Sequence, residues 1–217
     1  MKLTITFIFI FTFCNSLLFG QSGALSGDAN SINIRLSSAG VSTYKGIEGS
    51  PYLDENFKTA KIGTDDKSYL VRYNAYNEKI QVKVDDNKIM NLNNEDKYVV
   101  RVSEGGTYLP VKYEDGKEGF GRLLWNNSKG DQLIKRQIIE LEAPTETNGY
   151  MKAQPAKFSK VRAFYYIKKQ ERISKIPTGN KIYKEVFDSN LKAIAKKQKL
   201  KPNNEEDLIK LCDLYFR

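Results

Sequence analysis

Apolar and polar residues alternate along the chain between residues 69 and 141. Ile80, Val82 and Val84 are separated by single polar residues. A period of two places these aliphatic side chains on one face of an extended chain, which is typical of a half-buried β-strand. The same alternation occurs a few residues upstream, beyond a polar stretch containing an asparagine that tolerates turn geometry. The pattern predicts a β-hairpin over residues 69–84.

Five further extended segments follow, and each is preceded by turn-forming residues. They cover residues 89–92, 98–102, 108–113, 120–125 and 133–141. Asp115-Gly116 is the strongest hairpin signal, because a type I′ turn needs positive φ at both central residues. Strands at this spacing, with no helical pattern between them, predict an antiparallel sandwich or small barrel rather than parallel βαβ units. Gly119-Phe120-Gly121 is interpreted as a strand bend rather than a phosphate-binding loop.

The extended pattern resumes after a linker that carries Pro144. Residues 157–158 and 161–167 are predicted strands, residues 168–172 a turn, and Ile173 to Ile176 a return strand. A Pro-Thr-Gly-Asn sequence then ends the β region.

The hydrophobic period changes to that of a helix over residues 181–217. One predicted helical face carries Tyr183, Phe187, Leu191 and Ile194, and a second carries Leu208, Leu211, Cys212 and Tyr215. Lys201-Pro202 separates the two, Asn204 is a suitable N-cap, and three acidic residues follow it where the helix dipole favours them. The pattern predicts a helical hairpin, with Cys212 packed on its apolar face rather than reactive.

The first 20 residues have the features of a secretory signal peptide. Lys2 precedes an apolar run over residues 3–13, and the small residue Gly20 precedes Gln21. A membrane anchor is the alternative, but the apolar run is short for a spanning helix. Residues 21–48 are predicted to be a flexible leader, in which Ile32, Ile34 and Leu36 alternate and could add an edge strand.

These patterns predict four parts. They are a signal peptide over residues 1–20, a leader over 21–48, an antiparallel β domain over 49–177 and a helical hairpin over 178–217, packed on or beside the β domain. The fold class is therefore mainly β with a C-terminal α-helical hairpin.

The net charge and the number of cysteines are consistent with export but do not identify a binding partner. The chain carries 35 basic and 26 acidic residues, for a net charge of +9. Signal removal takes one lysine and one of the two cysteines, leaving Cys212 without an internal disulfide partner. The exported domain must therefore be stabilised by its core.

Four segments resemble a family of exported proteins of flavobacteria and their relatives for which no activity is known. They are residues 49–53, 71–77, 152–158 and 205–211, and the resemblance covers most of residues 49–217. The resemblance implies a bacterial cell with two membranes. Because the chain ends in a helix rather than a β-rich sorting module, it also implies retention in the periplasm or at the inner face of the outer membrane.

The composition argues against most catalytic and metal chemistry. The sequence has no histidine, which excludes Ser-His-Asp and Cys-His catalysis and removes the commonest metal ligand. One mature cysteine cannot build a structural zinc site. No catalytic residue, metal site or cofactor is therefore predicted. A carboxylate-only hydrolase using Glu140 and Glu142 is a remote alternative, because two acids alternating on an exposed strand are usually its solvated side.

Two basic stretches are the candidate binding residues. Tyr165, Tyr166, Lys168, Lys169 and Arg172 interleave aromatic and basic side chains, which could stack on sugars and pair with anions. An aromatic core face followed by a basic turn is the simpler interpretation. Lys196 and Lys197 belong to a lysine-rich helix that could meet an acidic partner or anionic lipid headgroups.

The sequence thus favours a non-catalytic envelope protein that acts as an interaction or accessory module for another envelope protein. Binding of an anionic glycan or lipid headgroup is the alternative. No nucleic acid partner is expected for an exported protein, and no transmembrane segment is expected after signal removal.

Overall fold

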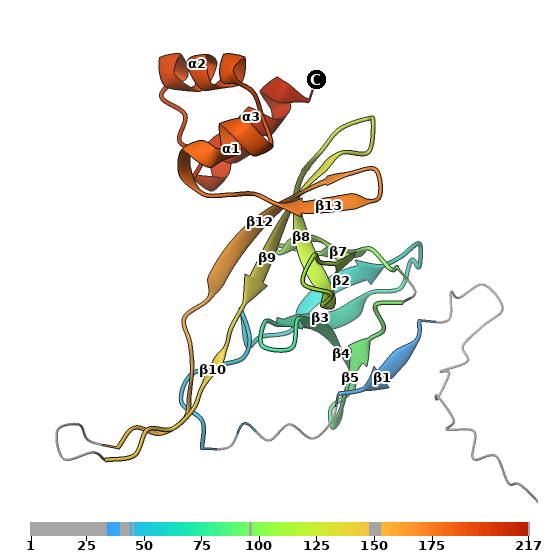
Figure 1. Ribbon diagram of the computed structural model, residues 1–217. Helices are drawn as coiled ribbons and strands as arrows, with labels where there is room; N and C mark the ends of the chain where they lie inside the picture. The colour runs from blue at the N-terminus through green and yellow to red at the C-terminus, as the bar shows by residue number, and fades with distance from the viewer. Residues whose placement is uncertain (1–33, 40–43, 45, 96, 148–152, 217) are drawn as a thin grey trace, which may run out of the picture.

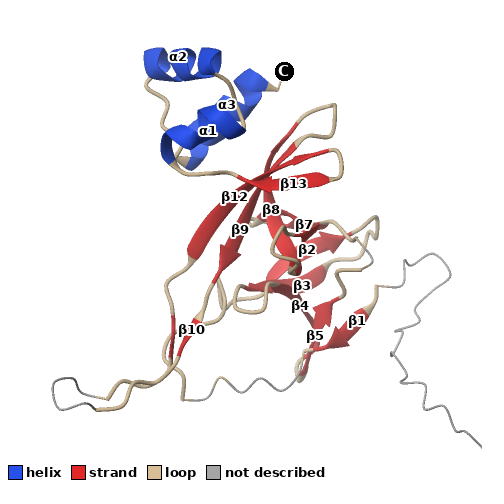
Figure 2. Cartoon of the chain, in the orientation of Figure 1, coloured by secondary structure: helices blue, strands red, loops and turns tan. Residues whose placement is uncertain are grey.

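The computed structural model describes residues 34–216 apart from 40–43, 45, 96 and 148–152. It confirms a mainly β protein with helices at its C-terminal end, and Figure 1 and Figure 2 show these helices grouped at one end of a large antiparallel sheet. The strands of this sheet are β1 (Leu36–Ser38), β2 (Lys58–Ile62), β3 (Tyr69–Asn74), β4 (Lys79–Asp85), β5 (Lys88–Leu92), β6 (Val100–Val102), β7 (Gly106–Lys112), β8 (Glu118–Asn126), β9 (Gln132–Ile138), β12 (Arg162–Lys169) and β13 (Arg172–Lys175). Two short strands, β10 (Leu141–Glu142) and β11 (Lys157–Phe158), form a separate ladder that projects as a narrow arm (Figure 1).

The large sheet consists of two meanders joined side by side. Its strand order is β1-β5-β4-β3-β2-β6-β7-β8-β9-β12-β13, and every pair is antiparallel. The pairing of β2 with β6, in register at Ala60 with Val102, connects the first meander to the second. The described strands β1 and β13 are the two edges and do not pair with each other, so the sheet is not closed into a barrel.

The turn between β3 and β4 brings the two meanders together. The Phe120 N–H of β8 donates to the Glu78 carbonyl at 3.1 Å, and the Ile139 N–H beyond β9 donates to the Ala75 carbonyl at 3.0 Å. The buried Tyr73 hydroxyl donates to the Phe120 carbonyl at 3.0 Å. Because these bonds satisfy backbone groups of both β8 and the end of β9, the turn fixes the first meander against the second.

Two main hydrophobic clusters lie on the inner side of the sheet. The first joins the meanders and includes Val71, Ile80, Val82 and Phe120, which are each almost fully buried. The second lies between the sheet and the helices. Its members include Leu133 from β9, Leu191 and Ala195 from the helix over residues 189–198, and Leu208 and Leu211 from the last helix. The helical segment therefore completes a core that the sheet alone would leave exposed.

The predicted first helix is wrong in its length and at one residue of its buried face, while Tyr183, Phe187 and Leu191 are buried as predicted. The chain forms a 3₁₀ turn, η1 (Gly179–Lys181), then α1 (Ile182–Glu185) and α2 (Ser189–Gln198). The carboxylate of Asp188 accepts a hydrogen bond from the Leu191 N–H at 2.7 Å and caps a new helix. This N-cap interrupts the continuous helix that the spacing predicted. Ile194 is consequently 40% exposed, and Ala195 takes its place in the core.

The last predicted helix is confirmed. Helix α3 covers Glu205–Tyr215, and its N-cap Asn204 accepts a hydrogen bond from the Asp207 N–H at 3.0 Å. Leu208, Leu211 and Cys212 are fully buried against the sheet cluster. The packing of Cys212 predicted from the helical pattern is confirmed, and burial raises the pKa of its thiol to about 12.

The hairpin at Asp115-Gly116 is confirmed, but its turn type is not I′. The Gly116 N–H donates to the Tyr113 carbonyl at 3.0 Å, and only Gly116 of the two central residues has positive φ. This is a type I turn followed by a left-handed glycine, the usual geometry of a longer hairpin loop. The Asp115 side chain is then directed by its ion pair with Arg136 rather than by the turn alone.

At the N-terminal side, the alternation through Leu36 does produce an edge strand, because Leu36 pairs with Leu92 of β5. The proposed signal peptide and the first part of the leader lie outside the described residues. Within the described parts of the chain, no helix is long and apolar enough to cross a membrane.

Candidate functional site

The predicted aromatic and basic residues of β12 do not form one surface. Tyr165 and Tyr166 project from opposite faces of the sheet, as adjacent strand residues must. The half-buried Tyr165 donates a hydrogen bond to Glu205 of α3 at 2.9 Å, and burial together with Glu205 raises the pKa of Tyr165 to about 12. Tyr166 is 4% exposed and packs against the ring of Tyr113, with the ring centroids 4.9 Å apart. The Tyr166 ring is therefore not available to stack on a ligand, and the Tyr165 hydroxyl is already bonded.

The basic residues of the same hairpin are also dispersed. Lys168 is half-buried on the outer face of the sheet, whereas the Lys169 ammonium lies 4.6 Å from the ring centroid of Phe216 on the helical side. Arg172 is exposed at the start of the edge strand β13. The simpler interpretation of this segment, an aromatic strand followed by a basic turn, therefore fits these positions.

A buried ion cluster lies where the turn between β3 and β4 meets β9. Arg136 of β9 is its centre, and Glu78 of the turn is one of its partners. The Glu78 carboxylate accepts two hydrogen bonds from Arg136, at 2.6 Å to Nε and 2.7 Å to Nη2. Asp115 accepts a third from Nη1 at 2.8 Å, and the guanidinium carbon lies 4.0 Å from the centroid of the Tyr113 ring. Burial alone would lower the pKa of Arg136, but the hydrogen bonds to Glu78, Tyr166 and Asp115 outweigh burial and raise it. The same contact with Arg136 lowers the pKa of Asp115 against the opposing effect of burial.

This cluster has the geometry of a structural ion pair. Arg136 and Glu78 are 4% and 7% exposed, and their bidentate contact leaves no open position for a reacting group. The glycines of β8 make room for it, because a Cβ at Gly119 would lie 2.8 Å from the Glu78 Cβ. The two meanders are therefore held together by charge as well as by backbone hydrogen bonds.

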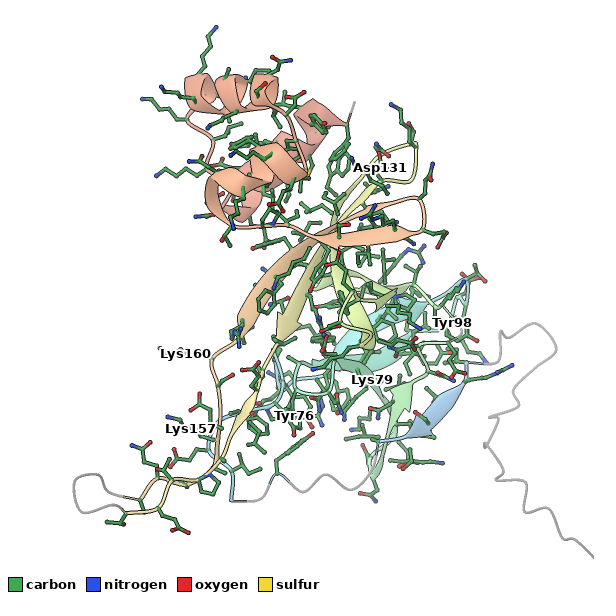
Figure 3. All side chains as sticks on the ribbon, in the orientation of Figure 1. Tyr76, Lys79, Tyr98, Asp131, Lys157 and Lys160 are labelled. Carbon is green, nitrogen blue, oxygen red and sulfur yellow. The ribbon has the colours of Figure 1, made fainter. Side chains whose placement is uncertain are left out.

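The carboxylates proposed for a hydrolase are both on the surface. Glu140 pairs with Arg162 at 2.8 Å, and Glu142 pairs with Lys157 at 3.3 Å on the β10–β11 arm, where Figure 3 labels Lys157. All four side chains are close to half exposed or more. Within the described residues, no group of three or more acidic, cysteine or histidine side chains is placed to hold a metal ion.

The helical segment carries a concentration of unpaired positive charge. We call it the lysine face, and it consists of Lys181, Lys184, Lys192, Lys196, Lys197, Lys199 and Lys201. All seven side chains are exposed, and within the described chain none of them is ion-paired. Figure 3 shows long side chains with terminal nitrogen atoms projecting from around these helices. The predicted residues Lys196 and Lys197 belong to this set, and Leu191 and Ala195 hold the opposite side of α2 in the core.

The helices that present the lysine face are fixed to the sheet. Glu205 at the start of α3 accepts hydrogen bonds from Lys135 of β9 at 2.5 Å and from Tyr165 of β12. Burial alone would raise the pKa of Glu205, and the bonds from Lys135 and Tyr165 outweigh burial and lower it. Trp125 of β8 packs against Phe216, with the ring centroids 5.7 Å apart. The position of the lysines is thus defined by the fold.

Sequence reasoning found the lysine face in part and missed the buried cluster. Glu78 and Arg136 are 58 residues apart, and no local pattern relates them. The glycines at 119 and 121 were the available signal, because glycine inside a strand often marks the close approach of another backbone.

Comparisons with protein-family models, with curated proteins and with solved structures found no match for this chain.

Proposed function

We propose that this protein is a non-catalytic, exported docking module whose lysine face binds an acidic surface of an envelope protein. The observation that carries the proposal is the set of seven exposed lysines without ion-pair partners in the described chain. A patch of uncompensated positive charge attracts and orients an oppositely charged partner.

The fold supports this surface over the sheet edge as the docking element. The edge strand β13 has only four residues and carries Arg172 and Lys175, and the Lys175 N–H is bonded to the Glu114 carboxylate at 3.3 Å. Short, charged and locally bonded edges disfavour the addition of another strand. The lysine face has no such obstruction.

A glycan platform has less support. The aromatic residues proposed to stack on sugars, Tyr165 and Tyr166, are engaged in internal contacts. Export and residence in the periplasm rest on the first 20 residues and on the family resemblance, and they belong to the same proposal.

The test is a crosslinked pull-down of the tagged mature protein from cell envelopes, at low and high salt. We expect one protein to be recovered in stoichiometric amount at low salt and released at high salt, because surface charge contacts are screened by salt. The double variant Lys196→Glu/Lys197→Glu is expected to abolish recovery.

The matched control is Lys88→Glu/Lys129→Glu, which changes the net charge equally at exposed lysines far from α2 in the sequence. The proposal would be contradicted if both double variants reduced recovery of the partner equally. It would also be contradicted if recovery did not depend on salt or on Lys196 and Lys197. Retention of the protein on anionic vesicles with no protein recovered would also overturn it, in favour of a lipid surface.

A further inference from the structure

The two meanders line an open cavity whose residues are separate from the lysine face. Its volume is about 260 Å³, and its walls come from β2, β3, β4, β6, β7, β8, β9, the loop over residues 53–56 and the turn between β6 and β7. Its apolar lining includes Val71, Ile80, Tyr73 and Tyr108, and the two tyrosine rings stack with centroids 5.4 Å apart. A cavity at the junction of two structural units is a frequent place for a small ligand.

Arg122 of β8 is the unusual residue of this cavity. Its side chain is half-buried and lines the wall, yet no hydrogen bond or ion pair to its guanidinium is found in the described part of the chain. Gly106 makes space for it, because a Cβ at that position would lie 2.9 Å from the Arg122 Nε. The guanidinium is therefore held at the wall by packing while its donors remain available.

The other cations of the cavity are already bound. Lys58 pairs with Asp54 at 3.0 Å, and Arg72 donates to the Gln81 side chain at 2.9 Å and to the Tyr52 hydroxyl at 2.8 Å. Arg72 also lies over the Tyr52 ring, with its guanidinium carbon 3.7 Å from the centroid. Arg122 differs from both, because its charge attracts Glu205 without a hydrogen bond or close ion pair in the described chain, and its donors can bind a ligand.

We propose that this cavity binds a small monocarboxylate that also carries hydroxyl or amino groups, with its carboxylate on Arg122. A guanidinium with free donors matches a carboxylate in two parallel hydrogen bonds. Asp54 and Glu104 line the same cavity, and they disfavour a second negative charge while accepting hydrogen bonds from hydroxyl or ammonium groups. Gln137, also in the wall, can bond to either end. The volume suits a compound the size of an amino acid or a monosaccharide acid.

Calorimetry with the full mature protein tests the site. The probes are glucuronate and serine, each compared with its uncharged counterpart, glucose and serine amide. We expect at least one acid to bind and neither glucose nor serine amide to do so. Which of the two acids binds distinguishes a sugar acid from an amino acid as the source of the carboxylate.

Three variants test whether Arg122 binds the carboxylate of the ligand. Arg122→Gln is expected to weaken binding by at least about tenfold, because a charge-assisted hydrogen bond is lost. Glu104→Gln is expected to tighten it a few-fold by removing a repelling carboxylate, which a general loss of structure could not do. Arg162→Gln, an exposed arginine paired with Glu140 outside the cavity, is expected to bind as the parent does.

The proposal is overturned if no acid binds at millimolar concentration, or if Arg122→Gln binds as tightly as the parent protein. The double variant Lys196→Glu/Lys197→Glu is expected to keep small-ligand binding, so failure of the cavity and failure of the docking face are distinguishable.

Discussion

Arg136 shows how one residue can connect parts of the chain that the sequence does not relate. It bonds to Glu78 in the turn of the first meander and to Asp115 in a hairpin of the second. The cost of burying these charges is offset only while all the partners are present. Replacing one partner therefore exposes the full desolvation cost of the others.

Replacing Arg136 with leucine is expected to lower the free energy of unfolding by about 3–5 kcal/mol, because Glu78 would stay buried without a counter-ion. Urea denaturation measures the change. The control is Arg162→Leu, whose ion pair with Glu140 is more than half exposed on both sides and should contribute less than about 1 kcal/mol. Equal effects of the two substitutions would show that the Arg136 cluster does not join the meanders.

At the scale of elements, the helices are placed by their caps and by one acidic residue at the sheet. Asp188 begins α2 and Asn204 begins α3, each by accepting a backbone N–H with its side chain. Glu205 then ties the first turn of α3 to β9 and β12. The orientation of the lysine face depends on these contacts.

Asp188→Ala is expected to cost about 1 kcal/mol of stability, because the Leu191 N–H loses its acceptor. Asp188→Asn keeps a side-chain oxygen at the cap and should cost much less. Denaturation monitored by the fluorescence of Trp125, which packs on Phe216, measures both. A loss of similar size in the asparagine variant would mean that charge, and not the cap, is what Asp188 contributes.

Glu205 predicts a pH dependence with a defined sign. Its pKa is lowered in the folded state, so its contribution is fully present above the ordinary glutamate pKa and is lost as the pH falls through the lowered folded value. Glu205→Gln should therefore be less stable than the parent at neutral pH, and the difference should shrink as the solution is acidified below the folded pKa.

Urea midpoints of the parent protein and of Glu205→Gln across the acid range test this expectation. Glu206→Gln is the matched control, since Glu206 lies in the same first turn of α3 but is exposed. A difference between parent and Glu205→Gln that stays constant with pH would contradict the assignment.

At the scale of the whole molecule, the sheet and the helices share a core. Leu133 and Ile167 of the sheet and Leu208 and Leu211 of α3 belong to one buried cluster. The predicted boundary at residue 177 therefore separates types of secondary structure without separating two independent cores.

We expect one cooperative unfolding transition in which Trp125 fluorescence and the far-ultraviolet circular dichroism of the sheet coincide. Trp125 reports the junction with the helices through Phe216, and the dichroism is dominated by the strands. Two separated transitions would show that the helical segment unfolds alone, and that its packing on Leu133 contributes little to the stability of the sheet.

Local patterns determined much of this architecture. Alternation with a period of two located the hairpin of β3 and β4 and most later strands, because side chains of a half-buried strand must alternate between core and solvent. The cap at Asn204 and the apolar face through Cys212 likewise needed only neighbouring residues. The lysines of α2 were visible for the same reason.

Long-range contacts decided the rest. The break before α2 depended on Asp188 competing with a continuous helix, and the type of turn at Gly116 was not fixed by its sequence alone. Tyr165 and Tyr166 were predicted to belong to one binding surface. In the structure Tyr165 bonds to Glu205 of α3 on one face of the sheet, and Tyr166 contacts Arg136 on the other. The sequence by itself determined strands, caps and surface charge, because these depend on neighbours along the chain. Only the tertiary structure decided which charges are neutralised and that the Arg122 guanidinium makes no hydrogen bond or close ion pair within the described chain, because those outcomes depend on residues that folding brings together.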